Sequence, residues 1–378
     1  MTNKVNNELD IEGNVQSEGD LNIGNTIERQ IIINQGPSEQ QLREIIRTEI
    51  ELALKQNQIL AEDKAREKLS NFSDKVLPKL VKSEMLDAFS DPTIQMFYRT
   101  AQQTAICSER EIDYDVLSEL LVYRINNKGN IARKASITRA AEVLDKISDE
   151  ALLAITIKYC SSFYPIAGDI NTGLQVMDNL YKDILSGAKL PDKDEWVDNA
   201  EILGVMRIES FSSMKKFEDI FFENTNGYWS KGIDMNSSLY EEVVNKLKSN
   251  NLPPNILGEH DFNPGYARLN IVNEDAINNI EINMVPVSGK GKVVITQKIT
   301  DAQKQVLAEI FNLYKNEKDL DAQIKTAFVE KLKQYPYLKS VMEWWNSNLK
   351  PATILNSTGR VLAHTNAKRL VEDMPDMV

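Results

Sequence analysis

A six-residue repeat close to the N-terminus restricts the fold of this chain more than any other feature of its sequence. Leucine, valine or isoleucine stands at every sixth position between residues 9 and 33, and Gly13 and Gly19 share this spacing. With Ile11 and Ile23 added as a second apolar position, the apolar residues that define the repeat are Leu9, Ile11, Val15, Leu21, Ile23, Ile27 and Ile33. Apolar residues separated by Gly, Asn and Asp are typical of very short strands joined by tight turns, and such repeats occur in parallel β-helices. The repeat therefore predicts a short β segment.

This β segment is too short to enclose a hydrophobic core of its own. Isolated small sheets are only marginally stable in water, so the apolar side chains need further protein to cover them. We expect copies of the segment from several chains to stack together. The sequence thus predicts a homo-oligomer, with the apolar residues given above as its oligomerisation residues.

The composition is that of a globular protein with an acidic surface. The chain has 378 residues, of which 42% are apolar and 26% are charged, and this predicts two or three domains with a substantial core. The net charge of −12 argues against sequence-independent binding of nucleic acid, because such binding depends on neutralising phosphates. It does not exclude one local basic face.

The cysteines and the apolar runs indicate the compartment. Cys107 and Cys160 are the only cysteines, too few for a disulfide framework, which favours a reducing compartment. Residues 1–7 lack the apolar core of a signal peptide. The longest apolar run, residues 151–157, is far shorter than the about 20 residues that span a membrane. We expect a soluble cytoplasmic protein without a membrane partner.

Residues 37–71 are expected to form a connecting amphipathic helix. The apolar residues that share one face of it are Leu42, Ile46, Ile50 and Ala53. Their spacing of four, four and three residues is helical. The face weakens at Asn57 and Lys64, so the sequence does not predict a long coiled coil.

The rest of the chain divides into three predicted parts. Residues 72–190 have apolar residues at helical spacing throughout, which predicts an all-helical domain, most simply a bundle. Residues 191–299 combine helical runs with strand-like runs at 205–208 and 293–295, which predicts an α+β, winged-helix-like module. Residues 300–378 are predicted to be a C-terminal helical region.

The expected fold class is therefore mainly α: a helical-bundle body, a small α+β (winged-helix-like) module and the β-repeat oligomerisation segment at residues 1–36. Ser136, Ser148 and either Thr300 or Asp301 are predicted helix caps, because a side-chain oxygen accepts hydrogen bonds from the free N–H groups of a first turn. Trp344 and Trp345 are predicted to lie in the core between the terminal helices.

Two segments of the chain resemble a bacterial protein family. Residues 355–366 read Leu-Asn-Ser-Thr-Gly-Arg-Val-Leu-Ala-His-Thr-Asn, which resembles the end of proteins similar to the abortive-infection alpha (Abi-alpha) proteins. Residues 196–208 resemble the helix-then-strand element of the same group. Asn356 and Arg360 depart from the more apolar residues usual there. The resemblance implies an intracellular role in phage defence and supplies no catalytic residues.

The opening β repeat resembles the Gly- and Asn/Asp-rich tags found at the front of several bacterial conflict-system proteins. This second resemblance covers residues 1–36 and implies the same setting of phage defence.

Histidine limits the chemistry that the chain can perform. His260 and His364 are the only two, which leaves little material for a His-rich metal site or a histidine-based triad. His364 is predicted to be a structural, hydrogen-bonded residue of the last helix. His260 lies in a loop where Glu259 or Asp261 could orient it, and loops do carry function, but the prediction is an exposed turn histidine.

No other pattern specifies a chemistry. Residues 289–292 lack the spaced glycine and the Ser or Thr of a phosphate-binding loop, and they predict a hairpin turn. Both cysteines lie on apolar helical segments and are predicted to be buried. The acidic clusters at 111–115 and 192–195 lie at linkers and helix starts, where carboxylates favour the helix dipole. We therefore predict no catalytic residue, no metal site and no cofactor.

Two basic clusters stand out from the acidic background. Arg133, Lys134 and Arg139 form one of them, and a solvated face is the prediction for it. The second cluster lies in the predicted winged-helix-like module. The residues there that could contact nucleic acid are Arg207, Lys215 and Lys216.

The pattern as a whole favours a non-enzymatic, oligomeric interaction or sensor protein of bacterial anti-phage defence, whose partners are its own copies and a phage or host protein. Two alternatives stay open. One is a winged-helix nucleic-acid-binding protein with salt-sensitive binding. The other is a metal-dependent hydrolase or nuclease that uses scattered acidic residues and a metal from solution.

Overall fold

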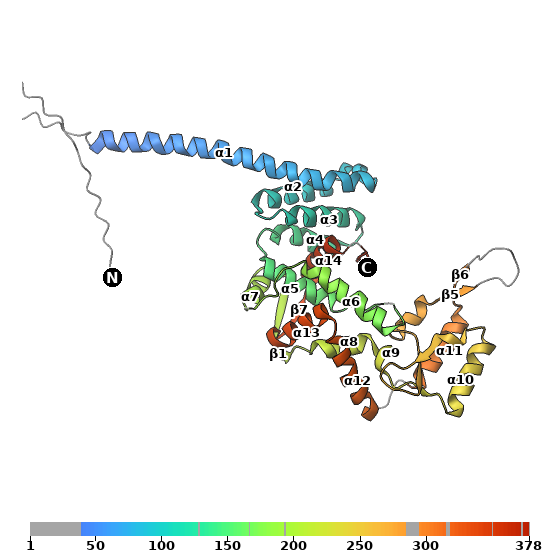
Figure 1. The fold of residues 1–378 in the computed structure, drawn as a ribbon. Helices are drawn as coiled ribbons and strands as arrows, with labels where there is room; N and C mark the ends of the chain where they lie inside the picture. Colours follow the sequence, from blue (N-terminus) through green and yellow to red (C-terminus); the bar gives the residue numbers. More distant parts are fainter. Residues whose placement is uncertain are drawn as a thin grey trace, which may run out of the picture. The chain divides into compact units, whose positions relative to one another are not determined.

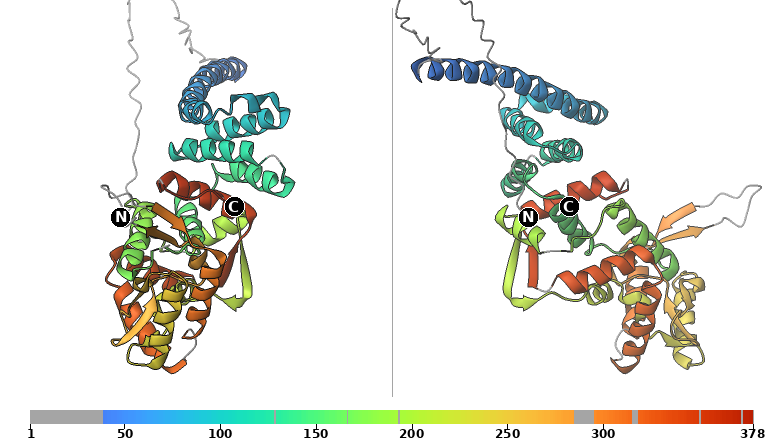
Figure 2. Two further views of the ribbon diagram at one scale, coloured as in Figure 1. Left: turned by 90° about the vertical axis from the view of Figure 1, so that its right-hand side faces the viewer. Right: turned by 60° about the vertical axis from the view of Figure 1, so that its left-hand side comes forward.

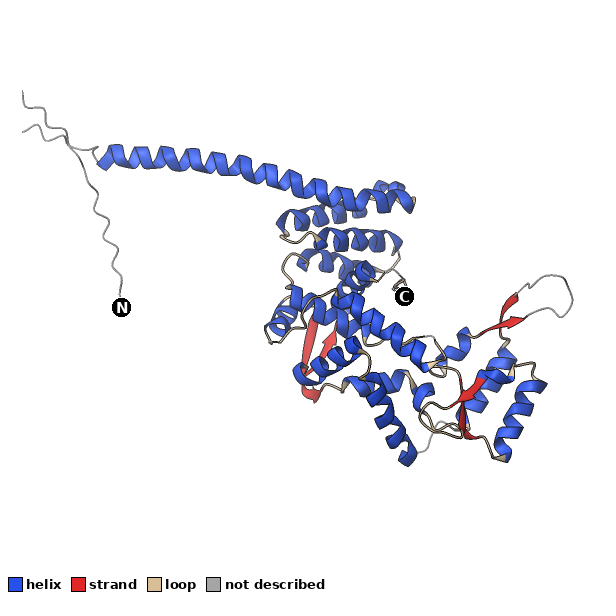
Figure 3. Ribbon diagram, viewed as in Figure 1, coloured by secondary structure: helices blue, strands red, loops and turns tan. Residues whose placement is uncertain are grey.

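The structure, a computed structural model, describes residues 39–127, 129–165, 167–192, 194–284, 295–314, 318–349, 351–371 and 373–377. The predicted β repeat at residues 9–33 lies outside the described residues. The chain divides into two compact units, residues 1–62 and 63–378. The described residues form fourteen α-helices and a few small sheets, which confirms the mainly α class with a small α+β part (Figure 3).

The first helix, α1, runs from Glu39 to Lys82, so it continues beyond the predicted end at residue 71. Within the second unit, Phe72, Val76 and Leu80 recur every four residues and are buried, as expected of one helical face against a core. The Lys68 ammonium donates to the carbonyl oxygens of Ile106 and Ser108, at 2.9 and 2.6 Å. These contacts attach the end of α1 to the next helices.

Five helices follow α1 in the second unit (Figure 1). They are α2 (Pro92–Cys107), α3 (Ile112–Asn126), α4 (Ile131–Val143), α5 (Asp149–Cys160) and α6 (Ile170–Leu185), with the 3-10 helix η1 (Leu86–Ser90) before them. Ser148 caps α5 through the backbone N–H of Ala151, at 3.1 Å, which confirms that prediction. Ser136 was predicted to cap α4 and this is wrong, because Asn130 caps this helix and Ser136 lies inside it.

The C-terminal elements return to these helices. They are α13 (Pro336–Asn348), β7 (Pro351–Leu355) and α14 (Ser357–Leu370). Helix α14 packs against α3, α4 and α5, and the views in Figures 1 and 2 agree on this placement. Its residues from Val361 to Ala367 are all buried. The end of the chain therefore completes the core of the helical body.

A small sheet joins two segments that lie far apart in the sequence. After α7 (Glu195–Ile202), β1 (Met206–Ser213) pairs antiparallel with β7, with Met206 opposite Leu355. The predicted strand at 205–208 thus exists, but its partner belongs to the C-terminal region. The strand pairing consequently crosses the predicted boundary at residue 299.

The remaining elements form a smaller α+β region. Its helices are α8 (Phe217–Asn224), α9 (Asn226–Trp229), α10 (Ser238–Ser249), η2 (Pro254–Ile256), η3 (Asp275–Asn279), α11 (Asp301–Asn312) and α12 (Lys318–Leu332). Its strands are β2 (Ile233–Asp234), β3 (Leu257–Glu259), β4 (Tyr266–Leu269), β5 (Glu281–Met284) and β6 (Ile295–Lys298), with sheet order β2-β4-β3 and a β5-β6 pair. Thr300 caps α11 with Gln303 in a capping box, which confirms it as a cap.

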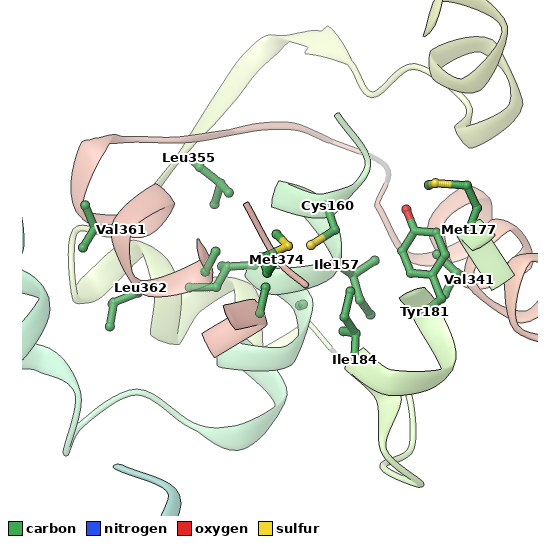
Figure 4. Close-up of a cluster of buried hydrophobic side chains, with 14 of the residues drawn as sticks. Ile157, Cys160, Met177, Tyr181, Ile184, Val341, Leu355, Val361, Leu362 and Met374 are labelled. Carbon is green, nitrogen blue, oxygen red and sulfur yellow. The ribbon is translucent and has the colours of Figure 1, made fainter. Parts of the chain in front are cut away.

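The core draws on elements from both ends of the second unit (Figure 4). Ile157 of α5, Tyr181 of α6 and Leu362 of α14 are fully buried. Trp344 and Trp345 are also buried, and the Trp345 ring lies 5.9 Å from that of Phe217, which confirms the predicted aromatic core. None of the helices in the described ranges is both long and apolar enough to cross a bilayer.

Candidate functional sites

The two segments that carry the family resemblance lie side by side. Besides the β1–β7 pairing, the backbone N–H of Asn356 donates to the carbonyl oxygen of Val205 at 3.3 Å, and the Asn356 side-chain amide donates to that of Gly204. A Cβ atom at Gly359 would lie 2.0 Å from the Val205 oxygen, which no real contact allows. Glycine at position 359 is therefore required for the start of α14 to approach the residue before β1.

A row of polar side chains on α14 faces α5. The Tyr159 hydroxyl and His364 Nδ1 lie 3.2 Å apart, at hydrogen-bond distance, and the amide of Asn366 donates to the Thr156 hydroxyl at 3.0 Å. The Arg369 guanidinium donates to the Asn366 oxygen at 2.8 Å. Buried polar groups need such partners, so these bonds specify how α14 packs.

Burial keeps His364 uncharged. Desolvation, with a smaller contribution from the charge of Lys368, lowers the pKa of His364 to about 4, and desolvation raises the pKa of Tyr159 to about 12. A cavity of about 240 Å³ adjoins them and is lined by Tyr123, His364 and Lys368 among others. His364 is thus buried and hydrogen-bonded, as predicted for a structural residue.

His260 was predicted to be an exposed turn histidine, and this is wrong. It is 2% exposed. The backbone N–H of Phe262 donates to its Nδ1 at 3.0 Å, so Nε2 carries the proton and donates to the Ser230 carbonyl at 2.7 Å. Desolvation lowers its pKa. The neutral ring attaches the loop to the end of α9. Sequence reasoning missed the burial of His260 because its partner, Ser230, lies thirty residues away in the chain.

The predictions for the cysteines and the acidic residues are confirmed in part. Cys160 is buried as predicted, but Cys107 is exposed, because it is the last residue of α2. Asp113 lies in the first turn of α3 as predicted, yet it is fully buried, bonded to Ser108 and paired with Arg110. Burial raises its pKa. This carboxylate connects the residue that ends α2 to the start of α3.

The predicted nucleic-acid contacts lie on different elements. Arg207 is exposed on β1, while Lys215 and Lys216 are exposed in the loop before α8. The Lys215 ammonium lies 2.7 Å from a carboxylate oxygen of Glu223, so part of its charge is already neutralised. Arg139 of the other basic cluster pairs with Glu142 at 3.3 Å. Both clusters lie beside acidic residues, which weakens them as phosphate-binding faces.

The first part of α1 presents apolar side chains to solvent. Its exposed large apolar residues are Ile46, Ile50, Leu52, Leu54, Ile59 and Leu60. Their exposed fractions range from 48% at Ile46 to 63% at Leu54. An apolar surface of this kind, gathered on one element, is typical of an interaction site.

Within the described ranges, no group of three or more His, Cys, Asp or Glu side chains could hold a metal ion. The sequence at 289–292, predicted to be a hairpin turn, lies outside the described residues. The sites that the structure does describe are a polar helix contact and an exposed apolar helix.

Fold and sites together define a mainly helical protein in which a C-terminal helix completes the core and the first part of the N-terminal helix exposes apolar side chains. A protein-family model described as ":-like" matches residues 36–376. Because this match covers more than half of the chain, the chain belongs to that family. No curated protein and no solved structure matches the chain.

Proposed function

We propose that this chain is a non-enzymatic, oligomeric interaction protein of bacterial anti-phage defence, and that it assembles through residues 39–62 of α1 together with the repeat at residues 9–33. The exposed apolar residues of α1 carry the proposal. Most of the stability of a helix in a protein comes from packing of its apolar face, and covering that face stabilises it by about 25 cal/mol per Å².

A second copy of the chain fits this face best. Ile46, Ile50, Ala53, Asn57 and Leu60 follow one another at intervals of four, three, four and three residues, which is the spacing of a coiled-coil seam. A single Asn within such a seam selects one register and oligomeric state at a cost in stability. Asn57, which weakens the apolar face, thereby becomes the residue that specifies how the copies pair.

The defence role is supported by the resemblance to Abi-alpha proteins. Its two segments, residues 196–208 and 355–366, are distant in the sequence but form one packed element through β1, β7 and α14. Segments that must fit each other are expected to be retained together in a family. Their contact therefore supports the view that they form a single motif.

The proposal is tested by the mass of the full chain in solution. We expect a multimer for the native sequence and a smaller species for the double variant Ile50→Glu, Leu60→Glu, because two buried carboxylates in the seam are strongly unfavourable. Thr48→Glu is the control, since residue 48 lies on the opposite side of the helix from the seam and also gains a carboxylate, one where the double variant gains two. A native monomer, or a multimer unaffected by the double variant, would disprove assembly through α1.

A phage challenge tests the cellular role. Cells that express the native chain are expected to restrict phage growth, and cells with the Ile50→Glu, Leu60→Glu variant are expected to lose this restriction at equal protein levels. Thr48→Glu should restrict phage as the native chain does. If the native chain gives no restriction against a broad phage panel, the defence role is wrong, whatever the oligomeric state.

A further inference from the structure

A second cavity, of about 480 Å³, lies where α5 ends near β7 and the start of α14. Its volume is in the range of small-molecule sites. Lys158 and Arg360 contribute positive charge to its wall, and none of the described residues that line it is acidic. Met214 and Ile220 provide apolar surface. The cavity therefore combines two cations with an apolar wall.

Lys158 has no anionic partner in the described part of the protein. Its ammonium nitrogen lies 3.6 Å from the Met214 sulfur and 5.2 Å from the centre of the Trp345 ring. The ring compensates part of the lost hydration through a cation–π contact but does not neutralise the charge. Burial lowers the pKa of Lys158 to about 8. Buried charges are normally paired, so this ammonium favours the binding of an anion from solution.

Two further groups face the same cavity. Arg360 forms no ion pair with any carboxylate that the structure describes, and its charge acts on the phenol of Tyr159, another lining residue. Thr353 is 3% exposed, and its hydroxyl has no hydrogen-bond partner within the described ranges. Buried polar atoms of this kind usually have a partner. An unpartnered hydroxyl and two unpaired cations in one cavity are the features expected of an anion site.

We propose that this cavity binds a small organic anion, with its phosphate or carboxylate group held by Lys158 and Arg360 and its apolar body against Met214 and Ile220. The anion pairs with these two cations in a partly desolvated place, where charge-assisted hydrogen bonds are strong. The apolar wall favours an anion with a hydrocarbon or aromatic part over an inorganic one.

The sequence contains one signal for this site. Lys158 is the only charged residue in the apolar run from Ala151 to Cys160, and a lone lysine within a buried helix end needs a partner or a function. The other contributors, on β7 and α14, come from about two hundred residues further along, and periodicity alone does not bring them together.

The test titrates the full chain with three probes: inorganic phosphate, phenyl phosphate and phenylacetate. Calorimetry gives their affinities, and the NMR signals of ¹³C-methylated lysines give the pKa of Lys158. We expect saturable binding, tightest for phenyl phosphate, and a rise of the Lys158 pKa from about 8 towards its ordinary value. Equal affinities for inorganic and phenyl phosphate would disprove the role of the apolar wall.

Two variants assign the binding to these residues. Lys158→Met keeps an unbranched apolar side chain that is one atom shorter, and Arg360→Gln replaces an exposed cation, so both are expected to fold. Each should weaken binding by at least about tenfold. Lys182→Met, which changes an exposed lysine of α6, is the matched control and should bind as the native chain does.

Two results would overturn the proposal: no saturable binding of any probe, or binding that survives both cavity variants. The site uses no residue of α1, so the Ile50→Glu, Leu60→Glu variant should bind the probes as the native chain does. The anion site and the oligomer can therefore fail independently of each other.

Discussion

The first part of α1 exposes large apolar side chains, whereas α14 buries polar side chains together with apolar ones. Large apolar residues such as Ile50 and Leu54 are more than half exposed on α1, while His364 and Asn366 are almost fully buried on α14. The difference lies in the partners: α14 packs against α3, α4 and α5. Burial in this protein is therefore decided by which elements meet, and a single helix's composition does not decide it.

A pair of matched truncations tests this comparison most directly. Leu362→Ala removes a fully buried side chain of α14 and should lower the free energy of unfolding by about 3 kcal/mol or more, from lost burial and a residual cavity. Ile59→Ala, on the exposed part of α1, should change the unfolding of residues 63–378 by less than about 0.5 kcal/mol. Urea unfolding followed by circular dichroism measures both. Equal effects of the two substitutions would contradict the difference in burial between α14 and the first part of α1.

Acid should selectively weaken the α14 contact through His364. Burial holds its pKa at about 4 in the folded state, below the ordinary 6.5, so between these values the unfolded chain binds a proton that the folded chain does not. The free energy of unfolding should thus fall as the pH drops from 6.5 to 4, by up to about 3 kcal/mol. His364→Gln should flatten this dependence in urea unfolding at a series of pH values. An unchanged slope would show that His364 is not the group responsible.

Removal of the Asn366 amide tests whether the polar row stabilises the packing. Asn366→Ala leaves the guanidinium of Arg369 without the oxygen that accepts two of its hydrogen bonds, which should cost about 2 kcal/mol. Asn312→Ala is the control, because this exposed amide donates to the carbonyl of Ala308 in its own helix. Its effect should stay within about 0.5 kcal/mol. The difference is measured as the shift in the urea midpoint, and similar shifts would contradict a special role for the row.

The elements that sequence alone could predict are those fixed by neighbouring residues. Ser148 and Thr300 cap their helices through bonds three residues away, so a local pattern was sufficient. The β1–β7 pair and the contact of His364 with Tyr159 join residues far apart in the chain. The sequence of neither segment indicates which distant segment it contacts. The buried state of His260 was missed for this reason, since Ser230 accepts its bond from another loop.

The candidate sites divide in the same way. The apolar periodicity of α1 was visible in the sequence, because it depends on residues three and four apart. The charge composition of the Lys158 cavity was not, because it depends on which side chains α5, β7 and α14 bring together. Apolar patterns therefore predict surfaces well, whereas an unpaired charge becomes visible only when its neighbours are known.

Lys158 extends the comparison between α1 and α14. It is a largely buried charged residue, but it lacks the hydrogen-bond partners that His364 and Asn366 have in the described part of the protein. Its folded pKa of about 8 lies below the ordinary 10.5, so the charged form destabilises the fold at pH 7, and this penalty disappears as the pH rises from 8 to 10.5. Lys158→Met should therefore raise the free energy of unfolding at pH 7 by about 1–2 kcal/mol, allowing for solvent screening of a partly exposed group. The gain should vanish above the ordinary lysine pKa and should shrink at pH 7 when phenyl phosphate is present, since a bound anion stabilises only the native protein. Thermal unfolding of both proteins across this pH range measures the effect. A variant less stable than the native chain at pH 7 would mean that Lys158 already has a counter-charge, and the buried cation would then belong with the paired residues of α14.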